Sequence, residues 1–263
     1  MTKPLKIQTS MAGGDQSALS RYMDLVVGQR GWLKLLVYEA VVMIAQKRAG
    51  ALGLLLRKKM YPWVLGSVGR NVTFGSNVVI RHPHKIHIGE GTVVDENALL
   101  DAKGDSNQGI DIGAGSYIGR NSIISCKNGD ISLGENANIG WNCTIAATSR
   151  IRIGRDCIIA AYSYIIGGGN YHYDNIDTPM CQSYDEQGKG GVDIEDDVWL
   201  GSHVAVLDGV KIAQGCVVAS GSTVTKDLPT MSISLGSPAK PVRQRLPGEN
   251  GESITSETSG HST

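Results

Sequence analysis

Aliphatic and aromatic residues return every six positions through most of this chain. From Val68 onward, twenty-one such positions form seven triplets, and the spacing inside each triplet is six. The triplets are Val68, Phe74, Ile80; Ile88, Val94, Leu100; Ile112, Ile118, Ile124; Leu133, Ile139, Ile145; Ile153, Ile159, Ile165; Ile194, Leu200, Val206; and Ile212, Val218, Val224. A fixed period of this kind predicts a repeat architecture.

The period has a simple geometric interpretation. Three legs of six residues make one triangular coil, so residues 66–229 are predicted to form an all-β parallel β-helix of about seven coils. With coils stacked about 4.8 Å apart, the prism is roughly 34 Å long. Small residues four positions after the aliphatic ones are also expected to point inward: Thr92, Ala98, Ser116, Ser122, Ala137, Cys143, Cys157, Ser163, Cys216 and Ser222. Three of the five cysteines are thus interpreted as small core residues.

Extra residues enter only between triplets, so all insertions should lie at one corner of the prism. The separations there are 8, 12, 9, 8, 29 and 6 positions. The longest insertion, residues 166–193, is too polar and too rich in Gly, Asp and Tyr to be coil. A long excursion from a rigid scaffold is where function is expected.

The two ends differ from the repeat. Residues 1–65 are predicted to be a helical region, with helices at Trp32–Lys47 and Ala51–Met60, and basic residues accompany them. Two interpretations remain open: these helices cap the open end of the prism, or they lie on a membrane surface facing anionic lipid. Residues 230–263 form a C-terminal extension that ends in a tail without apolar periodicity, which predicts disorder.

Composition narrows the function classes. The net charge is zero, which argues against a nucleic-acid partner. No run of 18 apolar residues lacks a charge, so no spanning helix is expected. Five cysteines without metal-like pairing, and no secretory signal, suggest the cytoplasm. His82, His84 and His87 are interpreted as surface residues on a coil edge and not as a metal site, because no second ligand cluster accompanies them.

His172 is the candidate catalytic residue. It lies in the long insertion, in the segment GGGNYHYDNIDTPM, with Asp174, Asp177 and Glu186 nearby. A hydroxyl that attacks a thioester needs a base, and a histidine has its pKa near the working pH. No serine or cysteine nucleophile motif is present, so direct transfer is favoured over a covalent acyl-enzyme.

The segment from Gly190 to Arg245 resembles the C-terminal half of galactoside, maltose and surface-polysaccharide O-acetyltransferases of the hexapeptide acyltransferase superfamily. This resemblance implies that the helix is left-handed, that a homotrimer forms, and that acetyl-CoA lies in a groove between prisms. It also implies that the loop histidine is the general base. In the family, that histidine often comes one position earlier, where this chain has Tyr171.

The resemblance also assigns donor-binding residues. Trp199, in the VWLG motif, would flank the pantetheine arm, and Ser202, after Gly201, would contact the cofactor. Ser220 replaces the usual alanine whose backbone binds the pantetheine amides. Further candidates lie beyond them: Thr225 near the adenine end, and Lys240 and Arg243 near the CoA phosphates, where basic side chains also make physical sense.

The acceptor side is less defined. Tyr171, Tyr173 and Asn142 are the candidate acceptor-binding residues. The Asn and Asp that hold the sugar in galactoside acetyltransferase appear here as Gly140 and Thr148, so a simple galactoside is not expected. The sequence therefore predicts O-acetyl transfer to a sugar hydroxyl in polysaccharide or glycolipid biosynthesis, without a metal. N-acyl transfer to an amino sugar and a non-catalytic scaffold remain as alternatives.

Overall fold

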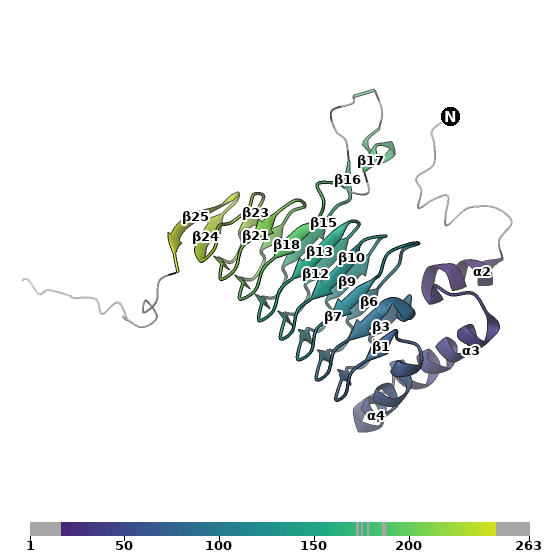
Figure 1. Cartoon of the computed structure of the whole chain (residues 1–263). Helices are drawn as coiled ribbons and strands as arrows, with labels where there is room; N and C mark the ends of the chain where they lie inside the picture. The colour runs from purple at the N-terminus through teal and green to yellow at the C-terminus, as the bar shows by residue number, and fades with distance from the viewer. Residues whose placement is uncertain (1–16, 172–173, 175, 178, 186–187, 246–263) are drawn as a thin grey trace, which may run out of the picture.

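The computed structural model describes residues 17–171, 174, 176–177, 179–185 and 188–245 (Figure 1). A prism of short parallel strands occupies most of the molecule, with helices at one end and a loop projecting from one side. The C-terminal tail predicted at residues 245–263 lies outside the described residues, except for Arg245. The predicted domain boundaries stay a prediction.

Three parallel sheets form the sides of the prism, and the chain visits them in turn, once per coil. The first sheet contains β1 (Ser67–Val68), β4 (Ile86–Ile88), β7 (Ile110–Ile112), β10 (Asp130–Leu133), β13 (Arg150–Ile153), β18 (Val192–Ile194) and β21 (Lys211–Ile212). The second contains β2 (Thr73–Phe74), β5 (Val93–Val94), β8 (Tyr117–Ile118), β11 (Asn138–Ile139), β14 (Ile158–Ile159), β19 (Trp199–Leu200), β22 (Val217–Val218), β24 (Ser232–Gly236) and β25 (Ala239–Gln244). The third contains β3 (Val79–Arg81), β6 (Leu99–Asp101), β9 (Ile123–Cys126), β12 (Thr144–Ala147), β15 (Tyr164–Gly167), β20 (Ala205–Val206) and β23 (Thr223–Val224).

This topology confirms the predicted left-handed parallel β-helix. The prediction of about seven coils falls short by one partial coil, because β24 adds to the second sheet and Leu228 bridges to Ile212 in the first. β25 then folds back on β24 as an antiparallel hairpin. The antiparallel return ends the prism, since it occupies the edge of the last coil.

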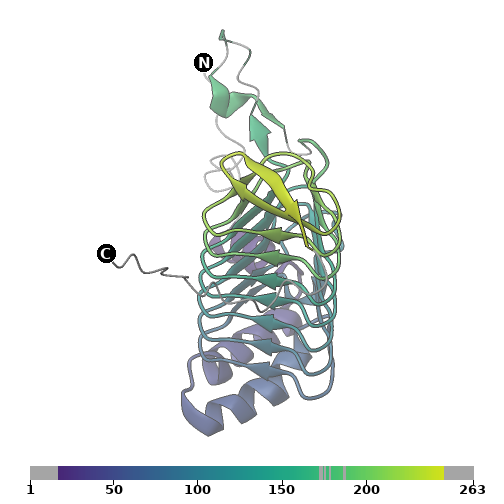
Figure 2. The same ribbon diagram turned by 90° about the vertical axis from the view of Figure 1, so that its left-hand side faces the viewer.

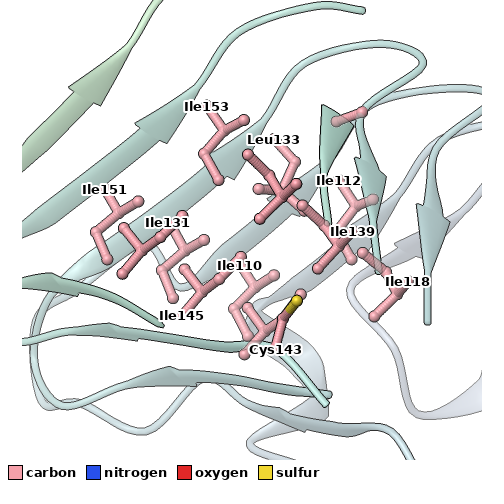
Figure 3. Packing of buried hydrophobic residues seen from close by; sticks show 14 of the residues in the cluster. Ile110, Ile112, Ile118, Ile131, Leu133, Ile139, Cys143, Ile145, Ile151 and Ile153 are labelled. Atoms are coloured by element: carbon pink, nitrogen blue, oxygen red, sulfur yellow. The ribbon is translucent and has the colours of Figure 1, made fainter. Parts of the chain in front are cut away.

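The repeat positions form the core. Twenty of the twenty-one predicted aliphatic and aromatic positions are buried, and Val68 is partly buried against the same cluster. Successive coils stack like on like, as with Ile139 on Ile159, and the isoleucines interdigitate along the prism axis (Figure 3). All ten predicted small inward positions are buried as well. Burial of each large aliphatic side chain contributes about 1.5–3 kcal/mol, so the stack as a whole stabilises the fold.

The N-terminal helices cover the first coil (Figure 2). They are α2 (Ala18–Tyr22), η1 (Met23–Val27), α3 (Trp32–Val41), η2 (Val42–Gln46), α4 (Gly50–Met60) and η3 (Tyr61–Trp63). Tyr38 donates its hydroxyl to the carbonyl of Ile80 at 2.8 Å, and the buried Arg57 donates Nε to the carbonyl of Phe74 at 2.9 Å. These bonds satisfy carbonyl groups that the first coil would otherwise leave unpaired. The inner face of the helical layer therefore caps the first coil, as one of the two interpretations of the sequence predicted.

The histidines near the first insertion correct one expectation. His82 and His84, which flank the start of η4 (Pro83–Lys85), were expected on the surface, but His82 is buried and His84 is partly buried. Both pack beneath Gly28, where an added Cβ would lie 2.5 Å from Nδ1 of His82. They belong to the contact between the helical layer and the prism. Among the described residues, no helix combines the length and the hydropathy that crossing a membrane requires.

Candidate active site

The long loop begins and ends at one point on the prism. It contains β16 (Asn170–Tyr171), η5 (Met180–Gln182) and β17 (Tyr184–Asp185), and β16 and β17 pair antiparallel at its base. The buried Asp208, from the next coil, accepts hydrogen bonds from the amides of Gly168 at 2.7 Å and Gly191 at 2.8 Å. One carboxylate thus fixes the residues at which the chain leaves and rejoins the prism. Nothing in the sequence pattern singled out Asp208.

The candidate acceptor residues of the loop are only partly described. Tyr171 is about half exposed, and its ring lies 5.1 Å from that of Tyr184 across the β16–β17 pair. His172 and Tyr173 lie outside the described residues, so their roles stay predictions. All insertions, this loop included, do lie at the corner between the third and first sheets, as the spacing predicted.

A different prism edge holds three of the predicted donor residues, Gly201, Ser202 and Ser220. We call it the site edge: residues 140–142, 160–162, 201–203 and 219–221, where the second sheet turns into the third. Ser202 and Ser220 lie here on adjacent coils, and the amide of Gly221 donates to the carbonyl of Ser202 at 2.9 Å. An added Cβ on Gly201 would lie 2.6 Å from the amide nitrogen of Ser220. The two coils therefore approach closely only because residue 201 is glycine.

Trp199 lies next to this edge on the outer surface of β19. Its side chain is 52% exposed, while Leu200 beside it is buried. A tryptophan whose ring is about half exposed in its own chain marks a surface suited to a ligand or a partner. The structure thus brings Trp199, Gly201, Ser202 and Ser220 together.

Asn142 lies on the same edge, at its earlier end. The edge positions of successive coils stack through backbone hydrogen bonds. The amide of Asn142 donates to the carbonyl of Arg120 at 3.0 Å, and the amide of Tyr162 donates to the carbonyl of Trp141 at 2.9 Å. The amide of His203 donates to the carbonyl of Ala161 at 3.1 Å. Asn142 has φ +54°, a left-handed conformation that asparagine tolerates well. The predicted acceptor residue and the predicted donor residues are therefore parts of one surface.

Two residues of this edge were missed as site candidates. Tyr162 and His203 occupy the left-handed corner position with φ +63° and +60°, where lower coils carry asparagine. Their rings lie 4.9 Å apart on the surface. Bulky residues in this conformation carry a backbone cost, and such residues concentrate at functional sites. The signal was present in the sequence, as a break in the run of asparagines at this corner.

The hairpin β24–β25 carries the predicted phosphate-binding residues. The amide of Gly236 donates to Oγ of Ser222 at 3.1 Å, which ties the hairpin to the last full coil beside the site edge. Lys240 stands opposite Leu235 on β25, and Arg243 stands opposite Ile233. Both side chains are exposed, as is Thr225 directly after β23. The hairpin therefore extends the site edge with positive charge.

The cysteine thiols of the core are unsuited to nucleophilic catalysis. Burial raises the pKa of Cys126 to about 12 and that of Cys157 to about 11, so both stay protonated at neutral pH. Cys126 is a further core cysteine, beyond the three that the repeat predicted. Within the described part of the chain, no group of three or more His, Cys, Asp or Glu residues is placed to hold a metal ion.

Comparisons with known proteins agree with the hexapeptide repeat. The model of the bacterial transferase hexapeptide (six repeats) matches residues 191–226, and that of the hexapeptide repeat of succinyl-transferase matches residues 67–102 and 130–166. SACOL2570 of Staphylococcus aureus (strain COL), which is named as an acetyltransferase, is 33% identical over 155 residues, covering 48% of this chain and 70% of that protein. The chain belongs to the hexapeptide-repeat acetyltransferase family.

Further relatives and solved structures share part of the sequence or the fold. The chain spans 44%, 62% and 53% of the length of three further relatives named as acetyltransferases. The polySia-specific acetyltransferase NeuO shares the fold at 21% identity and a TM-score of 0.52, covering 73% of this chain and 88% of NeuO. So does AntD, an N-acyltransferase from Bacillus cereus in complex with dTDP and 3-hydroxybutyryl-CoA, at 18% identity and 0.51, with 77% and 92% covered.

Proposed function

We propose that this hexapeptide-repeat acetyltransferase moves an acetyl group from acetyl-CoA to a hydroxyl of a saccharide. The observation that carries the proposal is the site edge. Its two serines lie on closely stacked coils, the exposed Trp199 lies beside it, and the basic hairpin β24–β25 extends it. Together these parts form one strip. A long, thin donor with a phosphate-rich end and an apolar arm matches that strip in shape and charge.

Each part of the strip fits one part of the donor. Trp199 offers a flat apolar face to the pantetheine arm, and the backbone around Ser220 offers hydrogen-bonding groups to its amides. Thr225 follows β23 at the corner between the third and first sheets and therefore lies apart from this strip, so its place near the adenine rests on the family resemblance alone. Lys240 and Arg243 would bind the phosphates, since exposed cations on a rigid hairpin suit phosphate oxygens.

A homotrimer would complete the site. The loop with His172 emerges between the third and first sheets, whereas the site edge lies between the second and third. The width of the third sheet therefore separates the two within one chain. If three prisms pack side by side, the loop of one chain can reach the site edge of its neighbour, and the exposed Trp199 gains a second wall.

The reaction would be direct transfer. The acceptor oxygen attacks the thioester carbonyl carbon, and His172 takes the hydroxyl proton as the new C–O bond forms. The carbon–sulfur bond then breaks, and CoA leaves as its thiolate. Backbone amides of the site edge can stabilise the oxyanion. Tyr171, Tyr173 and Asn142 would hold the acceptor, and the function fits polysaccharide or glycolipid assembly on the cytoplasmic side.

N-acyl transfer to an amino sugar is the second candidate, because AntD, an N-acyltransferase, shares this fold at low identity. The two candidates differ in their products, since an ester is cleaved by mild alkali and an amide is not. A non-catalytic scaffold is the third alternative from the sequence, and it predicts no donor binding at all.

Calorimetric titration of acetyl-CoA into the full chain tests the proposal. We expect saturable binding with a micromolar Kd and about one site per chain. Trp199→Ala should weaken binding about 5- to 50-fold. Trp63→Ala is the matched control, because Trp63 is also a largely exposed tryptophan and lies on the helical layer, at 64% exposed against 52% for Trp199. An absence of binding at millimolar acetyl-CoA would refute the donor assignment and favour the scaffold.

A further inference from the structure

The helical layer has an outer face that its own chain leaves uncovered. On α3, Leu35, Tyr38 and Val41 are buried against the rest of the protein. On the opposite side of α3–η2 and of α4 lie six apolar side chains that are 58–76% exposed. These residues define the outer face: Trp32, Leu33, Leu36, Met43, Leu52 and Leu55. Apolar side chains gathered on one helical layer, unlike ones scattered singly over a surface, are suited to an apolar partner.

Positive charge predominates on this layer. Residues 17–66 contain eight Lys and Arg but only two Asp and Glu, whereas the whole chain has 25 of each. Both carboxylates are engaged: Asp24 forms an ion pair with Arg30 at 2.8 Å, and Glu39 accepts the hydroxyl of Tyr22. No Asp or Glu occurs between Glu39 and Glu90.

Several of these cations are available to a partner. Lys47, Lys58 and Lys59 are exposed, and none of them forms an ion pair with any described residue. Lys58 and Lys59 follow Leu55 on α4, so positive charge lies directly beside the apolar side chains. The outer face thus presents apolar side chains together with unpaired lysines, so a matching partner must be apolar and negatively charged.

We propose that the outer face of the helical layer docks on the surface of an anionic lipid bilayer. A bilayer supplies hydrocarbon for the leucines and tryptophan and anionic headgroups for the lysines, which is how amphipathic helices bind in the interfacial plane. A second copy of this chain matches less well, because it would bring the same positive charge against the first. The helices lie on the surface and do not span it, in keeping with their lengths.

This attachment orients the rest of the molecule. The hairpin β24–β25 lies at the end of the prism opposite the helices (Figure 1). Docking through the helical layer therefore leaves the hairpin away from the bilayer, with the loop and site edge between the two ends. A donor would enter from solution while an acceptor carried by lipid would lie at the membrane surface.

Sedimentation of the full chain with vesicles tests this inference. We expect binding to phosphatidylcholine vesicles that contain about 30% phosphatidylglycerol, weak binding to phosphatidylcholine alone, and a loss of binding in about 0.5 M salt. Leu36→Glu/Met43→Glu and Lys58→Glu/Lys59→Glu should each lower the partition coefficient about 10-fold or more. Circular dichroism and thermal melting verify that each variant folds.

Matched controls lie at other parts of the prism. Leu235→Glu changes an apolar side chain that is 48% exposed on the hairpin, and Lys103→Glu/Lys127→Glu reverses two cations at the insertion corner. Both should leave vesicle binding unchanged. The inference is overturned if anionic vesicles do not sediment the protein, or if controls and face variants lose binding equally. It is also overturned if the face variants instead abolish self-association of a protein that ignores vesicles. The face variants leave the site edge and the hairpin intact, so they should bind acetyl-CoA like the wild type, and a failure of this inference can be told apart from a failure of the donor assignment.

Discussion

Oδ1 of Asp208 accepts the backbone amide of Gly168 at 2.7 Å, and through this bond the loop that carries His172 is attached to the coil above it. The same oxygen accepts the amide of Gly191, and Oδ2 accepts that of Lys189 at 2.5 Å. A single buried carboxylate therefore organises both ends of an excursion of more than twenty residues. The position of the loop depends on a residue outside the loop.

Replacement of Asp208 by alanine should release both loop ends. Three amides would lose an acceptor, and we expect the free energy of unfolding to fall by about 2–4 kcal/mol, because bonds to a charged acceptor are strong and buried donors are costly to leave unpaired. Proteolysis and amide exchange should increase within residues 168–191 ahead of the prism. Asp208→Asn, which keeps one carbonyl acceptor, should show a smaller effect. Equal loop protection in wild type and Asp208→Ala would contradict this role.

Two neighbouring glycines at the loop exit offer a matched comparison. Gly190 and Gly191 have φ +100° and +103°, so alanine is strained at either position by about 1–3 kcal/mol. At Gly191 an added Cβ would also lie 1.9 Å from the carbonyl oxygen of Arg150, whereas at Gly190 nothing lies within 4 Å. Gly191→Ala should therefore lower the urea midpoint clearly more than Gly190→Ala. Equal midpoints would show that the coils move apart without cost.

The prism was predictable from the sequence, because each coil is specified by the spacing of apolar residues within a short segment of the chain. A buried aliphatic residue at each sixth position, as at Ile139 and Ile145, is enough to specify strand and corner, and like residues then stack between coils, as Ile139 does on Ile159. The partial eighth coil was missed, since β24 breaks the period that ends at Val224. The burial of His82 was missed too, because it depends on where the helices dock and not on any local pattern.

The site was predictable only where the family resemblance supplied it. Ser202 and Ser220 are 18 positions apart, so the period alone places them on adjacent coils. Tyr162 and His203 each lie three positions after the second apolar residue of their coil, so the repeat register does place them on one edge. The contact between their rings is what the register does not predict. Asp208 acts through a contact between a coil and a loop, which periodicity does not describe.

Lys240 should recognise the phosphate end of the donor. Its exposed position on β25 suggests a modest electrostatic contribution, and we expect Lys240→Ala to raise the KM for acetyl-CoA about 3- to 10-fold with little change in kcat. The sharper test compares acetyl-CoA with its 3′-dephospho derivative. The wild type should prefer acetyl-CoA, and Lys240→Ala should lose much of that preference. Lys127→Ala, at the insertion corner, is the control.

Stability should fall in mild acid because of the histidines under the helical layer. Desolvation lowers the pKa of His84 to about 4, helped by His82, Lys85 and Lys34, and desolvation also lowers the pKa of His82 despite Asp101. Both imidazoles are neutral in the folded chain, whereas in the unfolded chain they take up protons near pH 6.5. The free energy of unfolding should therefore decrease as the pH falls below about 7, and for His84 the decrease should continue to about pH 4, by at most about 1.4 kcal/mol per pH unit for each histidine.

Urea unfolding at intervals between pH 7 and 4 measures that slope. Carboxylates such as Asp24, whose pKa the Arg30 guanidinium holds low, add to the loss of stability only at the acidic end. His84→Asn should flatten the slope between pH 6.5 and 5, while His203→Asn, on the exposed site edge, should not. An unchanged slope in His84→Asn would mean that the helical layer takes up protons without opening.

The assignment of the general base rests on a choice between two histidines. His172 belongs to the loop, and His203 lies on the site edge with its ring against Tyr162. If His172 removes the acceptor proton, His172→Ala should lower kcat about 10²- to 10⁴-fold while acetyl-CoA still binds. His203→Ala should then change kcat by less than about 10-fold, since its imidazole would contribute a surface and not a base. The pH profile separates the roles further, because loss of the base removes the acidic limb of kcat/KM. If His203→Ala instead abolishes turnover and His172→Ala does not, the base lies on the prism, and the loop serves only to hold the acceptor.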